Sequence, residues 1–188
     1  MVRVVSPDET SDETVSSIED LYHRPGFLIR RAHQIAVSLF LEETAELGIT
    51  TTQYGVMVIL RARSDLDQVG VAGLVGIDRS TAGLVIAKLE EAGYVVREAD
   101  PRDRRRKILV LTEQGHAVLD ALAEPARRAK QRTLSVFTPR QAEMFIDLLD
   151  RLVTALNSSA RTPIEYPASA RDQDAGTRRL HRAVVRGE

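Results

Sequence analysis

The residues of this sequence best suited to chemistry are cations packed into one short segment. Four arginines fall within five positions, namely Arg102, Arg104, Arg105 and Arg106, and Lys107 follows them. Like charges at this density repel one another unless an anion lies among them, and a nucleic-acid backbone is such an anion. The ordinary explanation of a charge run is a solvated turn. Here an apolar strand is predicted on each side of the run, at 95–97 and 108–111, and a helix-turn-helix pattern precedes it, so we favour DNA as the partner.

A second group of polar side chains opens a helix predicted over 78–92. Asp78 is a good N-cap, and the first turn then offers Arg79, Ser80 and Thr81. An arginine at this place can pair with a guanine edge, a hydroxyl can serve a base or a phosphate, and the free backbone N–H groups can hold a phosphate. The alternative is that Ser80 and Thr81 only help to cap the helix.

The next outward positions of this helix are less polar than a DNA-reading surface usually is. Gly83, Leu84 and Ala87 are expected there, with Lys88 beyond them. We therefore expect few direct base contacts, with Leu84 against a thymine methyl group and specificity that depends largely on DNA shape.

The remaining inventory argues against an enzyme, a metal protein and a membrane protein. The sequence has no G-x-S-x-G, Walker A or H-E-x-x-H motif, no cysteine, and its histidines are far apart: His23, His33, His116 and His181. We expect no catalytic residue, no metal and no cofactor. No apolar run reaches about 18 residues and the first residues are acidic, so we expect a cytoplasmic protein. The formal net charge is −1, so any DNA affinity must come from local clusters of charge.

Elements that position these residues follow from periodicity and capping signals. In the first half we predict helices over 18–47, disturbed near Pro25, over 54–63 after a Thr50/Gln53 capping box, and over 69–75 and 78–92. In the second half we predict one helix from Thr112 to about 136, kinked at Pro125, and another from Thr138 onward. The chain thus divides into a flexible N-terminal segment (1–17), a dimerisation helix (18–49), a DNA-binding region (50–112), dimerisation helices (113–159) and a basic C-terminal tail (160–188).

The helices at the two ends of the chain carry more apolar surface than one small module covers. Burying this surface against a second copy is the economical arrangement, so we predict a twofold homodimer. Such a dimer places two reading helices roughly 34 Å apart, which matches a pseudo-palindromic operator in double-stranded DNA.

The order and spacing of several motifs resemble the MarR-type transcriptional regulators. They are Thr50-x-x-Gln53-Tyr54, Ile77-Asp78-Arg79-Ser80-Thr81, Leu89-Glu90-x-x-Gly93-Tyr94-Val95, Asp100-Pro101-Arg102-Asp103-Arg104-Arg105 and Leu111-Thr112-x-x-Gly115. The resemblance covers about residues 20–158. It implies a mainly α fold with a small β wing, a winged helix-turn-helix whose dimerisation region is built from the N- and C-terminal helices. It also implies that Arg105 enters the minor groove while Asp100 and Asp103 brace the hairpin by pairing with arginines.

The segment 24–34 is similar to one branch of this family, which controls the degradation of aromatic acids and includes members that respond to aryl-CoA thioesters. Regulators of this kind usually bind effectors where the dimer helices meet the DNA module. That resemblance makes five residues candidates for ligand binding: Phe27, Arg30, Arg31, His33 and Tyr54. A cation beside an apolar wall suits an aromatic carboxylate or a CoA phosphate. Alternatively, Arg31 pairs with Glu42, Glu43 or a carboxylate of the partner, and His33 and Tyr54 are packing residues.

The leading interpretation is a DNA-binding regulator, a repressor of aromatic-compound catabolism genes that an aromatic acid or its CoA thioester releases. Three alternatives stay open. They are an architectural DNA-binding protein without an effector, a regulator of stress or efflux genes that senses other phenolic or lipophilic ligands, and a small enzyme or partner-binding module on a winged-helix scaffold.

Overall fold

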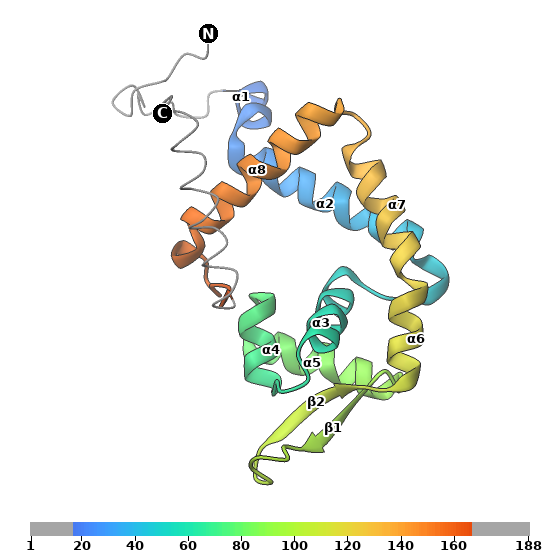
Figure 1. Ribbon diagram of the computed structural model, residues 1–188. Helices are drawn as coiled ribbons and strands as arrows, with labels where there is room; N and C mark the ends of the chain where they lie inside the picture. The colour runs from blue at the N-terminus through green and yellow to red at the C-terminus, as the bar shows by residue number, and fades with distance from the viewer. Residues whose placement is uncertain (1–16, 167–188) are drawn as a thin grey trace, which may run out of the picture.

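The computed structural model describes residues 17–166, and Figure 1 shows them as an upper frame of helices above a smaller lower head. The frame consists of α1 (Ile18–His23), α2 (Pro25–Glu43), α7 (Ala123–Leu134) and α8 (Pro139–Ala155). The head consists of α3 (Thr51–Ala62), α4 (Gln68–Val75), α5 (Arg79–Glu91), β1 (Val95–Ala99) and β2 (Lys107–Leu111). The helix α6 (Glu113–Ala121) leads from the head up to α7, and two short 3-10 turns, η2 (Ala45–Leu47) and η3 (Asn157–Ser159), follow α2 and α8. This is the mainly α fold with a two-stranded wing that the sequence predicts.

The head is built around one apolar core. Its buried side chains come from all five head elements and from α6, and they include Val56, Met57, Leu60, Val71, Ile86, Leu89, Val95, Leu109, Leu111 and Leu119. Helices α4 and α5 are bent by 110° at the turn that joins them, which is the geometry of a helix-turn-helix. Gly76 ends α4 with φ at 74°, in the left-handed region that glycine adopts without a Cβ clash.

The helix caps agree with the sequence-based predictions. Thr50 and Gln53 form a complete capping box at α3, and Thr138 and Gln141 form another at α8. Asp78 caps α5 and Thr112 caps α6, each by accepting a hydrogen bond from a backbone N–H group three residues later. These caps fix where each helix begins, and the cap at Asp78 places the first polar residues of α5 at its exposed end.

Two long helices of the sequence-based prediction are each divided in two. The stretch predicted over 18–47 is broken at Arg24, whose extended backbone separates α1 from α2 because the following Pro25 disfavours helical geometry in the residue before it. The stretch from Thr112 to 136, expected to kink at Pro125, ends a helix at Ala121 and starts another at Ala123. Pro125 has no N–H group to donate to the carbonyl of Ala121, so the hydrogen-bond ladder is interrupted one turn before the proline.

The frame is held together where α7 packs along α2. At this contact Arg128 Nε lies 2.7 Å from a carboxylate oxygen of Glu43, and Arg132 lies 2.9 Å from Glu43 and 2.8 Å from Glu42. Hydrogen bonds from Arg128 and Arg132 hold the pKa of Glu43 below its usual value. The sequence-based alternative that Arg31 pairs with Glu42 or Glu43 is wrong within the described part of the subunit, because Arg31 donates to Gln34 Oε1 and forms no ion pair with either carboxylate there.

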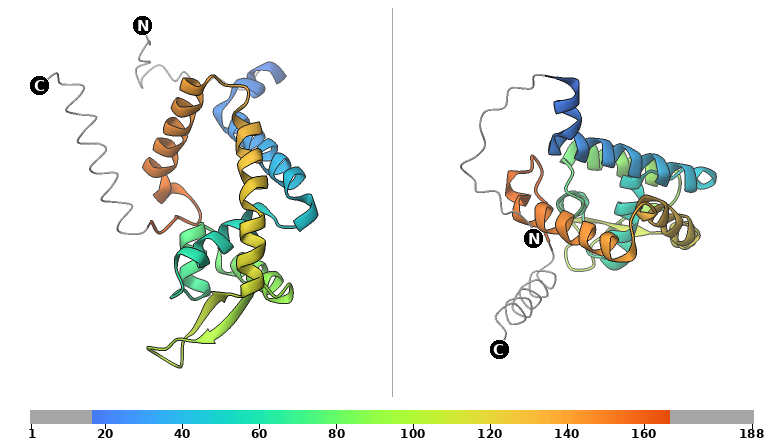
Figure 2. Two further views of the ribbon diagram at one scale, coloured as in Figure 1. Left: turned by 45° about the vertical axis from the view of Figure 1, so that its right-hand side comes forward. Right: turned by 90° about the horizontal axis from the view of Figure 1, so that it is seen from above.

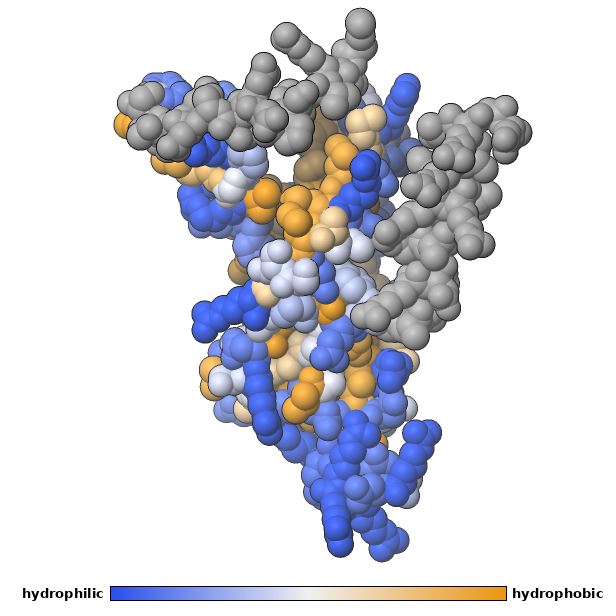
Figure 3. All heavy atoms as spheres, turned by 90° about the vertical axis from the view of Figure 1, so that its left-hand side faces the viewer, coloured by the Kyte–Doolittle hydropathy of each residue, from blue (hydrophilic) through white to orange (hydrophobic). Residues whose placement is uncertain are grey.

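Much apolar surface of the frame stays uncovered in one chain. No residue of α8 is buried, and its exposed side chains include Met144, Ile146, Leu148, Leu149, Leu152 and Val153. Ile18, Leu21 and Tyr22 of α1 are exposed as well. Figure 3 shows apolar side chains gathered on the upper half of one face, above the hydrophilic wing. A surface of this kind is what a second copy of the chain would cover.

Parts of the sequence-based segmentation lie outside the described residues. This applies to nearly all of the predicted N-terminal segment 1–17 and to the tail beyond residue 166. Between residues 17 and 166 no single helix is long and apolar enough to cross a membrane. The bent pair α4 and α5 reaches the required length and composition when the two helices are taken together.

Candidate nucleic-acid interface and effector pocket

The exposed end of α5 presents the polar residues predicted to contact DNA. Arg79, Ser80 and Lys88 are exposed. Thr81 is half-buried, and its hydroxyl donates to Asp78 Oδ2 at 2.7 Å, while its N–H donates to Asp78 Oδ1 at 2.9 Å. These hydrogen bonds, that from the Thr81 side chain first, hold the pKa of Asp78 below its usual value. The Thr81 hydroxyl therefore takes part in the cap, whereas Arg79 and Ser80 face solvent.

The outer face of α5 matches the sequence-based expectation at two of three positions. Leu84 is 69% exposed and Ala87 is exposed, so both can face a groove. Gly83 is half-buried, and a Cβ at this position would lie 3.1 Å from Nε2 of the Gln68 side chain on α4, so Gly83 lies at the edge of the contact between the two helices.

The wing carries its arginines at the tip, beyond the paired strands. The strands run antiparallel with Val95 opposite Leu111 and Ala99 opposite Lys107, so residues 100–106 form the connection. Arg102, Arg104 and Arg105 are exposed, and within residues 17–166 their guanidinium groups make no hydrogen bond or ion pair. Figure 3 shows the hydrophilic side chains of this region projecting from the lower end of the molecule.

Arg106 differs from the other wing arginines because its guanidinium group, although the side chain is 41% exposed, is paired with groups of the head and of the wing. It lies 3.3 Å from Asp67 Oδ2 and 3.1 Å from Asp100 Oδ2, and it donates to the carbonyl oxygen of Asp65 at 3.1 Å. Asp100 is buried and pairs with an arginine as expected. Asp103 instead accepts from the backbone N–H of Arg105 at 3.0 Å, so it braces the hairpin without a guanidinium partner.

A chain of side chains that sequence reasoning missed joins the wing to the start of α5. Arg97 on β1 donates to Glu90 at 2.9 Å and to Gln68 Oε1 at 3.3 Å, and Gln68 Nε2 donates to the carbonyl oxygen of Arg79 at 3.2 Å. The wing and the reading helix are thereby connected through α4. Since Gln68 and Arg97 are 29 positions apart, no local pattern in the sequence signals this contact.

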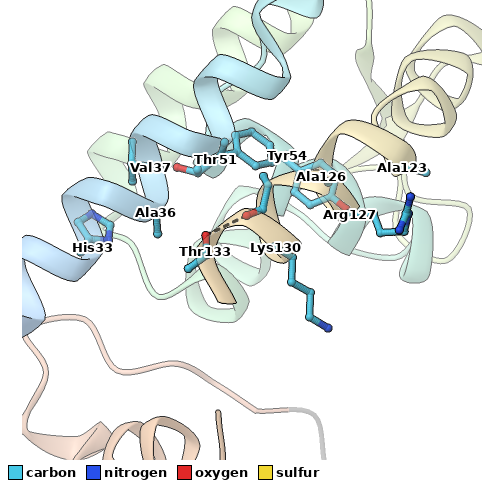
Figure 4. A pocket seen from close by; sticks show the side chains of 12 residues that line it. His33, Ala36, Val37, Thr51, Tyr54, Ala123, Ala126, Arg127, Lys130 and Thr133 are labelled. Carbon is cyan, nitrogen blue, oxygen red and sulfur yellow. Dashed lines mark hydrogen bonds between the residues drawn. The ribbon is translucent and has the colours of Figure 1, made fainter. Parts of the chain in front are cut away.

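A cavity of about 650 Å³ lies where the frame meets the head, between α2, α3 and α7. Its walls are mainly apolar, and Figure 4 shows Tyr54 and Thr51 of α3 facing α2, with His33 at one end. The cavity is lined by His33, Ala36, Val37, Phe40, Thr51, Tyr54, Ala123, Ala126, Arg127, Ala129, Lys130 and Thr133. The rings of Phe40 and Tyr54 lie 5.4 Å apart, which gives the cavity an aromatic wall.

Two of the residues that line this cavity, Arg127 and Lys130 of α7, are cations (Figure 4). Arg127 is paired with Glu124, whose carboxylate lies 2.5 Å from Nη2, and this hydrogen bond raises the pKa of Arg127. Lys130 forms no ion pair with any described residue. Its ammonium group is therefore available for a ligand anion. Sequence reasoning missed both residues because α7 is about 90 positions from α2.

The candidate ligand residues separate into two groups. His33 and Tyr54 line the cavity. Phe27, Arg30 and Arg31 lie nearer the start of α2, where the Arg30 guanidinium group is 4.9 Å from the centre of the Phe27 ring, and Arg30 and Arg31 donate to Gln34 Oε1 at 3.2 and 2.9 Å. The structure does not bring these three to the cavity of the same chain. Among the described residues no group of three His, Cys, Asp or Glu side chains could hold a metal ion.

Comparison with known proteins shows which proteins this chain is similar to. The model of the MarR family matches residues 49–107, which span α3, α4, α5 and the wing. A putative transcriptional regulatory protein for the hcr operon of Thauera aromatica is 30% identical over 148 residues, covering 78% of this chain and 85% of that protein.

Solved structures show the same fold in DNA-bound and ligand-bound forms. PcaV from Streptomyces coelicolor, in complex with its natural ligand, is 35% identical with a TM-score of 0.66, covering 72% of this chain and 96% of PcaV. The repressor CouR bound to a 23-mer DNA duplex is 26% identical with a TM-score of 0.68, covering 74% and 99%. CouR from Rhodococcus jostii RHA1 bound to p-coumaroyl-CoA is 28% identical with a TM-score of 0.62, covering 70% and 93%.

Proposed function

The chain belongs to the MarR family of DNA-binding transcriptional regulators, and from that premise we propose that it represses genes of aromatic-compound catabolism until an aromatic acid or its CoA thioester releases it from DNA. The family consists of regulators rather than enzymes, in agreement with the poor catalytic inventory of the sequence. The proposal covers the kind of effector, the DNA-contacting residues and the homodimer.

One observation carries the effector proposal, namely the cavity between α2, α3 and α7. Its walls belong both to the frame and to the head, so a ligand there contacts both parts. The position of the head relative to the frame determines whether the reading helices can bind DNA. The aromatic wall of Phe40 and Tyr54 suits an aryl ring, and Lys130 at the edge suits a carboxylate or a phosphate. One relative supports this class of ligand, since CouR from Rhodococcus jostii RHA1 has been solved with bound p-coumaroyl-CoA.

Release follows if the ligand favours a frame–head arrangement that is wrong for DNA. A ligand shifts an equilibrium only by its difference in affinity for the two arrangements, so contacts to α2 and α3 must change between them. In the DNA-bound arrangement we place Arg79 and Ser80 in the major groove, with Thr81 supporting them through the cap and Lys88 farther along the helix. We place Arg102, Arg104 and Arg105 along the adjacent backbone and minor groove, with Arg106 bracing the wing from inside.

The test is an operator-binding titration on a duplex from upstream of the protein's own gene, read by fluorescence anisotropy. Free aromatic acids, their CoA thioesters and neutral phenols are added to the preformed complex. We expect an acid or a thioester to release the DNA. If none of the three classes releases it, the effector proposal is wrong.

Two variants distinguish the cavity from the start of α2 as the effector site. Lys130→Gln removes the cation of the cavity that forms no ion pair with the described residues, and we expect it to weaken the effector's action at least about tenfold while operator binding without effector stays unchanged. Arg31→Gln is the matched control, because Arg31 lies outside the cavity. Loss of the response in Arg31→Gln alone would move the site to the start of α2.

A second candidate function is a regulator of stress or efflux genes that senses neutral phenolic or lipophilic ligands. The observation that favours it is the apolar lining, in which Ala36, Val37, Ala123, Ala126 and Ala129 offer no polar partner. Release by a neutral phenol that does not depend on Lys130 would support this alternative.

A further inference from the structure

The residues that follow α8 return to the head and form hydrogen bonds with it. The backbone N–H of Glu165 donates to the carbonyl oxygen of Gly73 at 2.9 Å, and the hydroxyl of Thr162 donates to the carbonyl oxygen of Gly76 at 2.8 Å. Figures 1 and 2 both show the end of this segment beside α4. We call residues 157–166 the strap.

The strap binds at the C-terminal end of α4, where backbone carbonyl groups lack partners within the helix. The last carbonyl groups of a helix have no intrahelical donor, and the strap supplies a donor to two of them. The approach depends on glycine. A Cβ at Gly76 would lie 2.7 Å from Ile164 Cγ1, and a Cβ at Gly73 would lie 2.8 Å from Glu165 Cδ. A side chain at Gly76 would push the Ile164 side chain of the strap away from the helix, whereas one at Gly73 would meet the movable end of the Glu165 side chain.

The strap is also closed on itself. The Asn157 side chain donates to the carbonyl oxygen of Ile164 at 2.9 Å and accepts from the N–H of Ile164 at 2.9 Å. One amide thus ties the first residue of η3 to the residue that lies over Gly76. A segment held in its bound shape loses less conformational entropy on docking than a free chain of the same length.

We propose that Asn157 and Thr162 are positioning residues for DNA binding, because the strap ties the helix-turn-helix to α8. Gly76 forms the turn that leads into α5, so holding its carbonyl holds the direction of the reading helix. No residue of α8 is buried within one chain, so the strap is a main link from that helix to the head. This inference rests on the proposed function, in which α8 belongs to the dimer interface and the two reading helices must keep a fixed separation.

The test compares Thr162→Val and Asn157→Leu with the wild type and with Thr162→Ser, which keeps the hydroxyl. Because the chain has no cysteine, Glu91→Cys in each background gives one spin-label site per subunit, at the C-terminal end of α5, where Glu91 is exposed. Pulsed electron paramagnetic resonance then measures the distance between the two spin labels, which reports the separation of the two reading helices in the dimer. Operator affinity, sedimentation and thermal melting are measured on the same backgrounds without the label.

For Thr162→Val and Asn157→Leu we expect a broader label-to-label distance distribution and about fivefold weaker operator binding, because a smaller fraction of dimers has the correct separation. Thr162→Ser should keep the distance distribution and the operator affinity of the wild type. A role limited to stability would lower the melting temperature and leave the distance and the affinity of the folded dimer unchanged, and that result would overturn the proposal. A wild-type protein that sediments as a monomer or ignores the duplex would refute the proposed function and this inference together.

Discussion

Replacing Arg105 by alanine separates the wing's role in DNA binding from its role in folding. The Arg105 guanidinium group makes no hydrogen bond or ion pair with the described residues, whereas Arg106, one position later, contacts Asp67, Asp100 and the carbonyl oxygen of Asp65. Arg105→Ala should therefore change DNA binding and leave the fold intact. Arg106→Ala is the matched control, with the same loss of charge from the wing but with the loss of its internal contacts.

The size of the effect follows from counterion release. Each neutralised phosphate contributes about −0.9 to the slope of log affinity against log salt. The proposed dimer presents two copies of Arg105, so the variant should flatten the slope by about 1.8. Over a fourfold rise in salt the wild type should therefore lose about twelvefold more affinity than Arg105→Ala.

The assay is an anisotropy titration of the upstream duplex at four or more salt concentrations between about 50 and 200 mM. We expect Arg105→Ala to flatten the slope at an unchanged melting temperature. We expect Arg106→Ala to lower the melting temperature, with a smaller change in slope. A wild-type slope in Arg105→Ala, or equal flattening in both variants, would refute the assignment of roles within the wing.

Three further predictions concern the folding of the frame and the head. Glu43→Gln should lower the midpoint of urea unfolding at neutral pH, because the folded-state pKa of Glu43 lies below its usual 4.5. The stability that ionised Glu43 contributes is therefore present above pH 4.5 and is lost as the pH falls through the folded-state pKa. In the variant the free energy of unfolding should accordingly fall less steeply in this acidic range. Thr112→Ala should cost about 1–2 kcal/mol in urea unfolding, because Thr112 caps α6 and donates to the Gly93 carbonyl at 2.7 Å, while Thr112→Ser should stay near wild type. Gly115→Ala should cost at least about 2 kcal/mol by the same measure, since its Cβ would overlap the Tyr94 carbonyl; a wild-type midpoint would contradict this packing.

The parts of the fold that the sequence predicted well are those set by local chemistry. The caps at Thr50, Asp78, Thr112 and Thr138 depend on residues within three positions of each other, so the relevant contact is visible in the sequence. The division of the two long helices was less visible, because the sequence shows that a proline disturbs a helix but not at which residue the chain leaves helical geometry.

The site was harder to predict because it joins distant segments. His33 and Tyr54 were identified and line the cavity, but its cations come from α7 and were missed. A candidate list drawn from one short segment of α2 included Phe27, Arg30 and Arg31, which share a helix with His33 and precede it in the sequence. Helical spacing places residues on a face, whereas the partner helix decides which part of that face encloses a cavity.

The wing is divided in two at Arg106, and this division has an evolutionary consequence. Toward the core, Val95, Leu109 and Leu111 are buried and fold the head, whereas residues 101–105 are all exposed. Mutations of the tip arginines Arg102, Arg104 and Arg105 therefore meet little selection for stability, while those at the base meet strong selection. A lineage that inherits this scaffold can drift in operator preference through its tip residues, and duplicated copies can acquire separate target genes before their folds diverge.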